Sequence, residues 1–298
     1  MEHNPENKIP TQDEIYNTNG SFDTPPEFGY IKKFAIEAVR QQRGTAILIV
    51  FLNILIVAAG GRMFHRISPP IGSLLVLATV FFIDMPLWVK VCGQFVKIYS
   101  KEKASAEGMF SGFFDNYWRK VGAMAVVTIP RMLVAIPMLA TGWAVHILML
   151  PLAVAALYAW TTFFMTVFIL EQHPNVTAID ALKLSVRMTN GHKGKLFSML
   201  LGFFGWALPV VVVTLIVAYP FLTALTAGHM HPLVALLLMA WMFMLVVVVI
   251  SIYWILFLGP RWFATYAGYC IVLKNRALAS GIVKRHELEG CPEETEWE

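Results

Sequence analysis

Two ionisable residues lie inside long apolar stretches of the sequence, where a charge is costly. Asp84 lies about six residues before Lys90, and Arg131 lies about eleven residues after Lys120. In helices that enter a membrane from one side, these positions are roughly 9 and 16 Å deep. Ionisable groups within a span usually pair or line a pathway. The two residues therefore predict a buried Asp84–Arg131 pair that lines or gates a polar route.

A structural interpretation also explains these residues. Asp84-Met85-Pro86 has the pattern of a helix N-cap followed by proline, which would break the helix near the interface. Arg131 follows Pro130 directly, so its guanidinium would satisfy a carbonyl freed at a kink. The sequence alone leaves both roles open.

A second candidate site is a cluster of basic residues between two apolar stretches. Its members are Lys183, Arg187, His192, Lys193 and Lys195. Basic side chains next to a membrane attract anionic headgroups, so we expect this cluster to contact anionic lipid. The same residues also serve as an ordinary positive anchor on the cytoplasmic side.

The common catalytic and metal-binding patterns are missing from the sequence. It contains no HExxH or GxSxG motif and no paired carboxylates within an apolar stretch, so we expect it not to be an enzyme. His229 and His231 have no further ligand nearby in sequence, which argues against a metal site. The cysteines are far apart, without the spacing of a zinc site or a disulfide framework: Cys92, Cys270 and Cys291. We therefore predict no cofactor and no metal.

The composition points to a lipid environment. Hydrophobic residues make up 57% of the 298 residues and charged residues only 14%. Soluble domains contain about 25% charged residues, so lipid must cover much of this surface. The formal net charge of +4 gives no reason to expect nucleic-acid binding.

Six apolar stretches have the length that a membrane span requires, about 20 residues at 1.5 Å each. They are residues 45–64, 71–91, 121–140, 145–170, 196–221 and 233–258. Spans of this kind must be helical, because no other open backbone satisfies its own hydrogen bonds in lipid. The predicted fold class is an all-α polytopic membrane helix bundle with about six transmembrane helices.

Basic residues occur on alternate connections between these stretches. Lysine and arginine are frequent before the first, between the second and third, between the fourth and fifth, and after the sixth. The other connections contain Arg62 and Arg66, then no charge, then His229 and His231. By the positive-inside rule, both termini are predicted to be cytoplasmic.

A repeat of composition accompanies this pattern. Basic amphipathic stretches at 30–43, 105–120 and 176–195 each lead into a predicted membrane hairpin, and 262–273 is related to them. Such stretches suit helices that lie in the headgroup layer, with apolar residues directed inward. We predict cytoplasmic interfacial amphipathic helices at these places.

The segment 178–206 resembles a bacterial integral membrane family known only as domain of unknown function 975. The matching positions are Met188, Gly191, His192, Lys193, Leu196, Phe197, Phe204, Gly205 and Trp206. Pro86-Leu87-Trp88 and the segment 109–113 also resemble this family, and the likeness covers roughly residues 30–275. About fifty residues separate the Gly-Trp pair from Pro260, where the family has a shorter interval. The resemblance implies a multipass protein of the bacterial inner membrane, with no established reaction, cofactor or substrate.

Three regions and one main function follow. We expect a disordered polar tail at 1–29, a six-helix transmembrane domain at 30–276 and an acidic C-terminal tail at 277–298. The predicted function is a non-enzymatic membrane module that organises lipids or partner proteins at the cytoplasmic face. The alternative is a small transporter or channel that uses Asp84 and Arg131.

Overall fold

The computed structural model describes residues 28–64, 75–138, 154–202 and 232–289, together with positions 205, 212, 219 and 223. Throughout these residues the regular secondary structure is helical, without a strand. The all-α prediction is confirmed for this part of the chain. Most of the predicted span 196–221 and both ends of the chain lie outside the described residues, as do His229 and His231.

Two helices joined by a sharp bend begin the structure. Helix α2 (Phe28–Gln41) and helix α3 (Arg43–Phe64) meet at 95°. The apolar side chains of α2 are buried against protein: Ile31, Phe34, Ala35 and Ala38 are each at most 3% exposed. They pack on helices α5 and α12, which are defined below.

The next helix is continuous from Leu75 to Tyr99 and contains a π-turn. The π-turn η2 (Val80–Asp84) is followed directly by α5 (Met85–Tyr99), with Pro86 near the start of α5. Proline lacks an N–H and cannot return a hydrogen bond to the preceding turn, which explains why the helix widens here.

The middle of the chain contains four further helical elements, three of which contact α5. They are the 3₁₀ helix η3 (Glu107–Phe113), α6 (Tyr117–Met138), a helix from Val154 to Gln172 whose last part is α8 (Thr166–Gln172), and α9 (Ala178–Thr189). The predicted amphipathic stretch 105–120 is not one helix. Asn116 interrupts it with a left-handed backbone, φ +48°, between η3 and α6.

The last part of the chain forms one long helix with a π-turn in it, followed by a short helix. Helix α11 (Pro232–Tyr253) continues through the π-turn η4 (Trp254–Leu258) into α12 (Gly259–Ala279), and α13 (Arg285–Glu289) follows. Residues 262–273 were expected at the membrane surface. Instead they lie within α12, where most side chains from Phe263 to Leu273 are buried.

The core is built where α5 and α12 cross. Phe95 and Phe263 stack with ring centroids 5.0 Å apart, and Trp88 lies 4.9 Å from Phe263. Gly268 permits this approach, since a Cβ there would lie 2.4 Å from the ring of Tyr99. Small residues on α12 therefore explain why a segment with an interfacial composition becomes the centre of the fold.

Three helices are long and apolar enough to cross a membrane within the described residues. They are Leu75–Tyr99, Val154–Gln172 and Met244–Ala279, and the bent pair α2–α3 makes a fourth if it counts as one span. This agrees with a transmembrane protein. The sequence predicts six spans, which is more than the number of candidate helices in the described residues.

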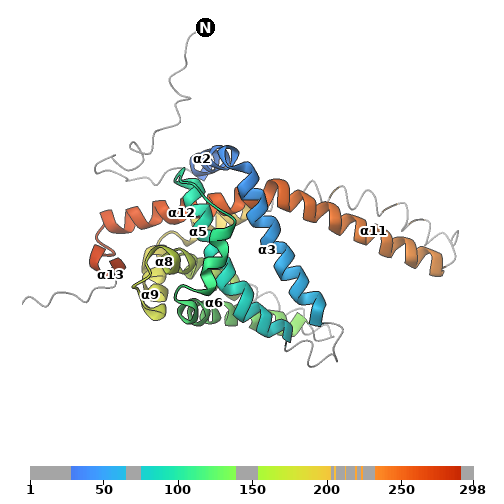
Figure 1. Cartoon of the computed structure of the whole chain (residues 1–298), viewed down its shortest axis with the longest axis horizontal. Helices are drawn as coiled ribbons and strands as arrows, with labels where there is room; N and C mark the ends of the chain where they lie inside the picture. Colours follow the sequence, from blue (N-terminus) through green and yellow to red (C-terminus); the bar gives the residue numbers. More distant parts are fainter. Residues whose placement is uncertain are drawn as a thin grey trace, which may run out of the picture.

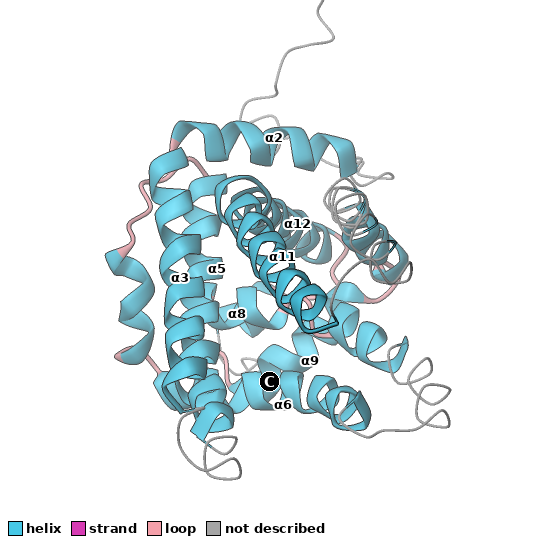
Figure 2. Ribbon diagram, turned by 90° about the vertical axis from the view of Figure 1, so that its right-hand side faces the viewer, coloured by secondary structure: helices cyan, strands magenta, loops and turns pink. Residues whose placement is uncertain are grey.

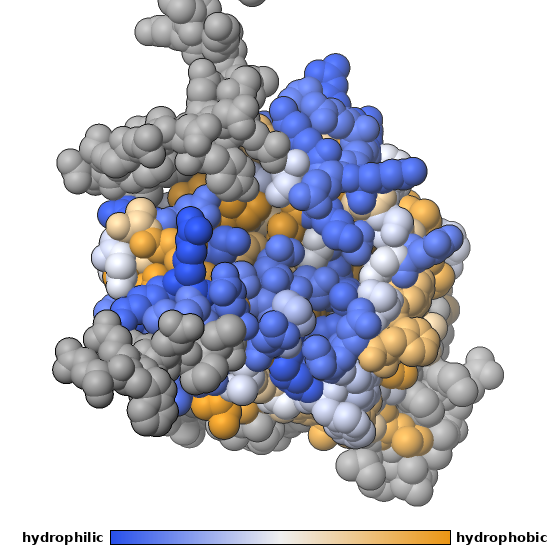
Figure 3. All heavy atoms as spheres, turned by 60° about the vertical axis from the view of Figure 1, so that its left-hand side comes forward, coloured by the Kyte–Doolittle hydropathy of each residue, from blue (hydrophilic) through white to orange (hydrophobic). Residues whose placement is uncertain are grey.

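The molecule has a polar end from which apolar helices extend. In Figure 1, α8, α9 and α13 gather on the left, while α11 extends to the right and α3 runs down to the right. Viewed from that right-hand side, α11 points toward the viewer and α2 lies across the top (Figure 2). Figure 3 shows hydrophilic side chains over the middle of the opposite, left-hand face, with hydrophobic ones at its sides.

Candidate functional site

Asp84 lies inside a continuous helix rather than at a helix start. Its backbone is helical, with φ −67° and ψ −41°, and its side chain makes no capping hydrogen bond. The prediction of a helix break at Asp84 is therefore wrong, because the π-turn absorbs the proline without ending the helix. Arg131 belongs to α6, but its side chain lies outside the described part, so the Asp84–Arg131 pair stays a prediction.

Tyr117 repairs the hydrogen bond that Pro86 removes. A residue with an N–H at position 86 would donate a hydrogen bond to the carbonyl four residues earlier, which is that of Phe82. The Tyr117 hydroxyl donates to this carbonyl oxygen at 2.7 Å. A side chain from α6 thus satisfies the backbone of the neighbouring helix, as expected where a proline interrupts an apolar helix.

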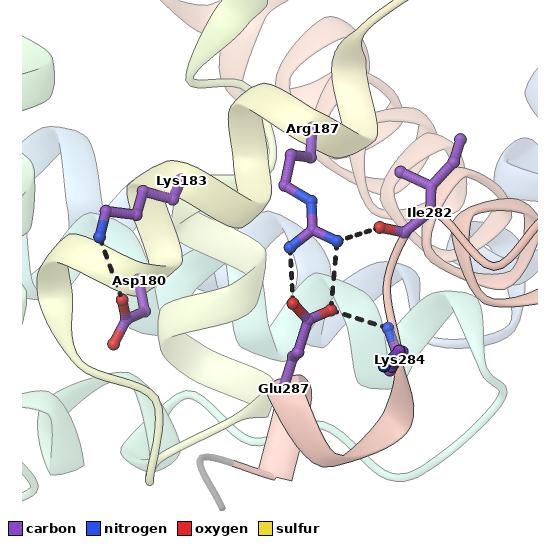
Figure 4. A network of polar contacts seen from close by, with 6 residues as sticks. All are labelled: Asp180, Lys183, Arg187, Ile282, Lys284 and Glu287. Atoms are coloured by element: carbon purple, nitrogen blue, oxygen red, sulfur yellow. Dashed lines mark hydrogen bonds and ion pairs between the residues drawn. The ribbon is translucent and has the colours of Figure 1, made fainter. Parts of the chain in front are cut away.

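Part of the predicted basic cluster is occupied by protein partners (Figure 4). Arg187 donates to both carboxylate oxygens of Glu287, at 2.6 and 3.3 Å, and to the carbonyl of Ile282. Lys183 lies 3.8 Å from Asp180 in an exposed pair. Arg187 therefore clamps α13 onto α9, and the segment 285–289 of the expected tail is folded.

The other members of the cluster follow α9. Lys193 Nζ donates to the Tyr158 hydroxyl at 2.7 Å, whereas Lys195 is exposed. Burial lowers the pKa of His192, and the positive charges of Arg276 and Lys195 lower it further. His192 is therefore mainly neutral at pH 7, and the cations of this surface are Lys183, Arg187, Lys193 and Lys195, of which Arg187 is held by Glu287.

A largely buried ion cluster lies where α5, α6 and α8 meet, and the sequence analysis did not predict it. Lys90 Nζ lies 3.0 Å from Glu171 Oε1 and 3.5 Å from Asp115 Oδ2. The side chains of Lys90 and Glu171 are only 13% and 12% exposed. Gly93 makes room for them, since a Cβ at this position would lie 2.4 Å from Glu171 Cγ.

Two groups in this cluster lack a hydrogen-bond partner. Lys120 is 2% exposed, and its Nζ makes no hydrogen bond, nor does Glu171 Oε2. Both residues line a cavity of about 530 Å³, together with Lys90, Phe114, Asp115, Asn116, Arg119, Leu170 and Pro174. Burial lowers the pKa of Lys120, as does Lys90, while the carboxylates of Glu171 and Asp115 raise it.

Arg119 holds one wall of the cavity in place. Its guanidinium donates to the carbonyls of Leu170, His173 and Val176, with 2.9 Å to that of His173. These carbonyls lie at and beyond the C-terminal end of α8, where a helix leaves acceptors without partners and where a positive charge is favourable. Arg119 therefore fixes the end of the helix that carries Glu171.

Topology contained a signal for this site. Lys90 follows the centre of the second predicted span, Lys120 precedes the third and Glu171 follows the fourth, so the predicted topology places all three on one membrane side. Glu171 is an acid at a position where the neighbouring span ends are basic. This difference marks Glu171 as a candidate site residue, but only the fold shows that it contacts Lys90.

Comparison with known proteins gives no information about this site. No family model, curated protein or solved structure matches the sequence. Among the described residues, no group of three or more His, Cys, Asp and Glu side chains is placed to hold a metal ion. What the cluster offers chemically is an ammonium and a carboxylate oxygen, both buried and without a hydrogen-bond partner, on two residues that line one cavity.

Proposed function

We propose that this protein is a non-enzymatic membrane module that organises anionic lipids, or proteins bound to them, at the cytoplasmic face. The observation that carries this proposal is the division of the surface. Hydrophilic side chains gather on one face (Figure 3), while α11 exposes apolar side chains such as Leu237, Trp241 and Val248. A surface of this kind suits a protein whose helices stand in lipid and whose polar end meets the headgroups.

The proposal includes the finer topology. Six spans, cytoplasmic termini and a place in a bacterial inner membrane follow from the basic connections and from the resemblance in residues 178–206. Helices α2 and α9 lie at the headgroup level in this arrangement. Their basic side chains, such as Lys33, Arg40 and Lys183, are exposed, which supports contact with anionic headgroups.

The test compares the anionic lipid that co-purifies with the protein. Replacing Lys193 and Lys195 with Gln should reduce bound phosphatidylglycerol, because each basic residue near the surface contributes about 1 kcal/mol of attraction. The loss should disappear at high salt, where exposed charges are screened. Asp84→Asn serves as the control and should leave lipid binding unchanged. Equal lipid content in all three proteins would refute the proposal.

A second candidate, a small transporter or channel, has one observation in its favour. Asp84 is the last residue of a π-turn within a candidate span, and π-turns are frequent at functional sites. A transport activity in proteoliposomes that Asp84→Asn abolishes, while the Lys193 and Lys195 variants retain it, would favour this function over the first. Absence of pH-dependent flux in the wild-type protein counts against it.

A further inference from the structure

Lys120 is the least expected side chain in the described part of the molecule. It is 2% exposed, and its ammonium makes no hydrogen bond. Burying a cation without a partner costs free energy, and such a residue is retained where another group completes the site. Lysine has a flexible stem, so its ammonium can turn toward a ligand in the cavity without movement of the backbone.

The charges around the cavity define what that ligand is. Three cations, Lys90, Arg119 and Lys120, face two carboxylates, those of Asp115 and Glu171. Lys90 pairs with both carboxylates, and Arg119 donates to the carbonyls around the end of α8. The cavity is therefore left with one excess positive charge and suits a singly charged anion.

Glu171 adds a second requirement. Its Oε1 meets Lys90 at 3.0 Å, but its Oε2 is buried and has no donor. A carboxylate oxygen accepts hydrogen bonds only, so a fitting ligand brings a donor group a few bonds away from its negative charge. A hydroxyl fits better than an ammonium here, because Lys90 already supplies a positive charge to this carboxylate.

The position of the cavity points to a lipid as the source of this anion. It lies where a candidate span ends at Gln172 and where α6 begins. Phe114 in its wall is 86% exposed, and Trp118 on the first turn of α6 is 72% exposed. Exposed aromatic residues at this level mark a membrane interface. The volume of 530 Å³ is within the range of about 300–1,000 Å³ typical of small-molecule sites.

We infer that this cavity binds the headgroup of a glycerophospholipid with a singly charged phosphodiester and a hydroxyl, as in phosphatidylglycerol. The phosphodiester accepts from Lys120 Nζ, the headgroup hydroxyl donates to Glu171 Oε2, and Phe114 and Trp118 contact the glycerol and upper acyl region. The inference rests on the membrane location proposed above. It differs from the surface contacts of Lys193 and Lys195 because it is a single pocket that is lined by buried charged side chains.

Matched lipids test the ligand side. The full-length protein is purified in detergent, delipidated, and mixed with phosphatidylglycerol, phosphatidylmethanol or phosphatidylethanolamine, and native mass spectrometry counts the bound molecules. One phosphatidylglycerol should stay bound at high salt, with about tenfold weaker binding of phosphatidylmethanol, which lacks the hydroxyl donor. If glycerol phosphate or inorganic phosphate competes as well as the lipid does, the site belongs to a soluble phosphate and the lipid assignment is overturned.

Matched variants test the protein side. Lys120→Met keeps an unbranched side chain one atom shorter and removes the charge, so it should weaken phosphatidylglycerol binding about tenfold or more. The lipid-free variant should melt at the same or a higher temperature than the wild type, because an unpartnered buried cation is removed. Lys103→Met, an equal change at an exposed position, should alter neither quantity.

The outcomes separate this inference from alternatives. Unchanged lipid binding in Lys120→Met refutes it, and a lower melting temperature of that lipid-free variant would show that Lys120 has a structural role instead. If Lys120→Met does not fold, Glu171→Gln decides, since it must remove the preference for phosphatidylglycerol over phosphatidylmethanol. Failure of the Lys193 and Lys195 test would remove the surface function but leave the salt-resistant site measurable.

Discussion

At the scale of single residues, the pair formed by Tyr117 and the carbonyl of Phe82 shows how a proline is accommodated in an apolar helix. Tyr117→Phe removes one hydroxyl, leaves the ring contacts and should lower the free energy of unfolding by about 1 kcal/mol. Thermal unfolding in detergent measures this. In a Pro86→Ala background the same change should cost less, because the restored N–H can serve the carbonyl. An equal cost in both backgrounds would contradict the explanation.

His173 gives a prediction about pH at the same scale. Burial lowers the pKa of its imidazole to about 4, and the charges of Lys274 and Arg119 lower it as well, against a hydrogen bond with the backbone of Leu288. The unfolded chain binds this proton near pH 6.5, so the stabilisation is complete above that pH and is lost as the pH falls toward 4. We expect unfolding at pH 5 to be easier than at pH 7 by about 1–2 kcal/mol from this residue.

The comparison that isolates this effect uses His173→Gln. The variant should show a smaller drop in unfolding temperature between pH 7 and pH 5 than the wild type does. Identical pH dependence in the two proteins would show that His173 is not the group that titrates.

Residue chemistry was the part of the molecule that the sequence predicted least well. Charges inside an apolar stretch, such as Asp84, are obvious in a sequence, whereas Lys120 and Glu171 stand at the ends of such stretches and look like ordinary anchors. Their importance depends on burial and on which neighbours satisfy them, and both are set by contacts between distant segments. Arg187 shows the opposite error. The sequence predicts that it contacts lipid, but it is paired with Glu287, which is a hundred positions away along the chain.

At the scale of elements, the crossing of α12 with α2 and α5 depends on Gly268. A Cβ there would lie 2.4 Å from Tyr99 Cε2 and 2.8 Å from Ile31 Cγ2. Gly268→Ala should therefore lower the free energy of unfolding by about 1–3 kcal/mol through overpacking. The matched control is Gly122→Ala in α6, where nothing lies within 4 Å. Alanine favours the helix there, so stability should stay equal or rise by up to about 1 kcal/mol. Similar unfolding temperatures for the two variants would contradict the role of Gly268.

A helix can be predicted from the sequence where the spacing of its apolar residues and the capping residues at its ends indicate the same boundaries. Helix α9 begins after Thr177, which accepts a hydrogen bond from the backbone of Asp180, and ends before Gly191, whose φ is +77°. For α12 the same kind of pattern was misleading. An amphipathic sequence shows that one face is apolar, but lipid and protein cover an apolar face equally well. Gly268 is the detail that favours protein, and its effect requires knowing that Tyr99 lies opposite.

At the scale of the whole molecule, low charge and long apolar stretches were sufficient to predict a helical membrane protein. They do not fix how many stretches cross the bilayer, since a buried core helix and a span have similar compositions. Three helices fit a span in the described residues, while the alternation of basic connections gives six. The two numbers agree only if α3, α6 and the segment 196–221 also cross, which places Lys103 and Lys195 on one side and His231 on the other.

Single-cysteine labelling tests this arrangement. Cys92 and Cys270 are at most 2% exposed and should not react with a membrane-impermeant maleimide, so only Cys291 needs replacement by Ser. His231→Cys should react in intact cells, because one predicted span separates this position from Lys195, which is predicted to be cytoplasmic. Lys103→Cys and Lys195→Cys should react only after the membrane is opened, because two spans lie between them. Labelling of position 195 from outside would remove the fifth span from the fold, and with it the cytoplasmic location of the basic cluster on which the lipid proposal depends.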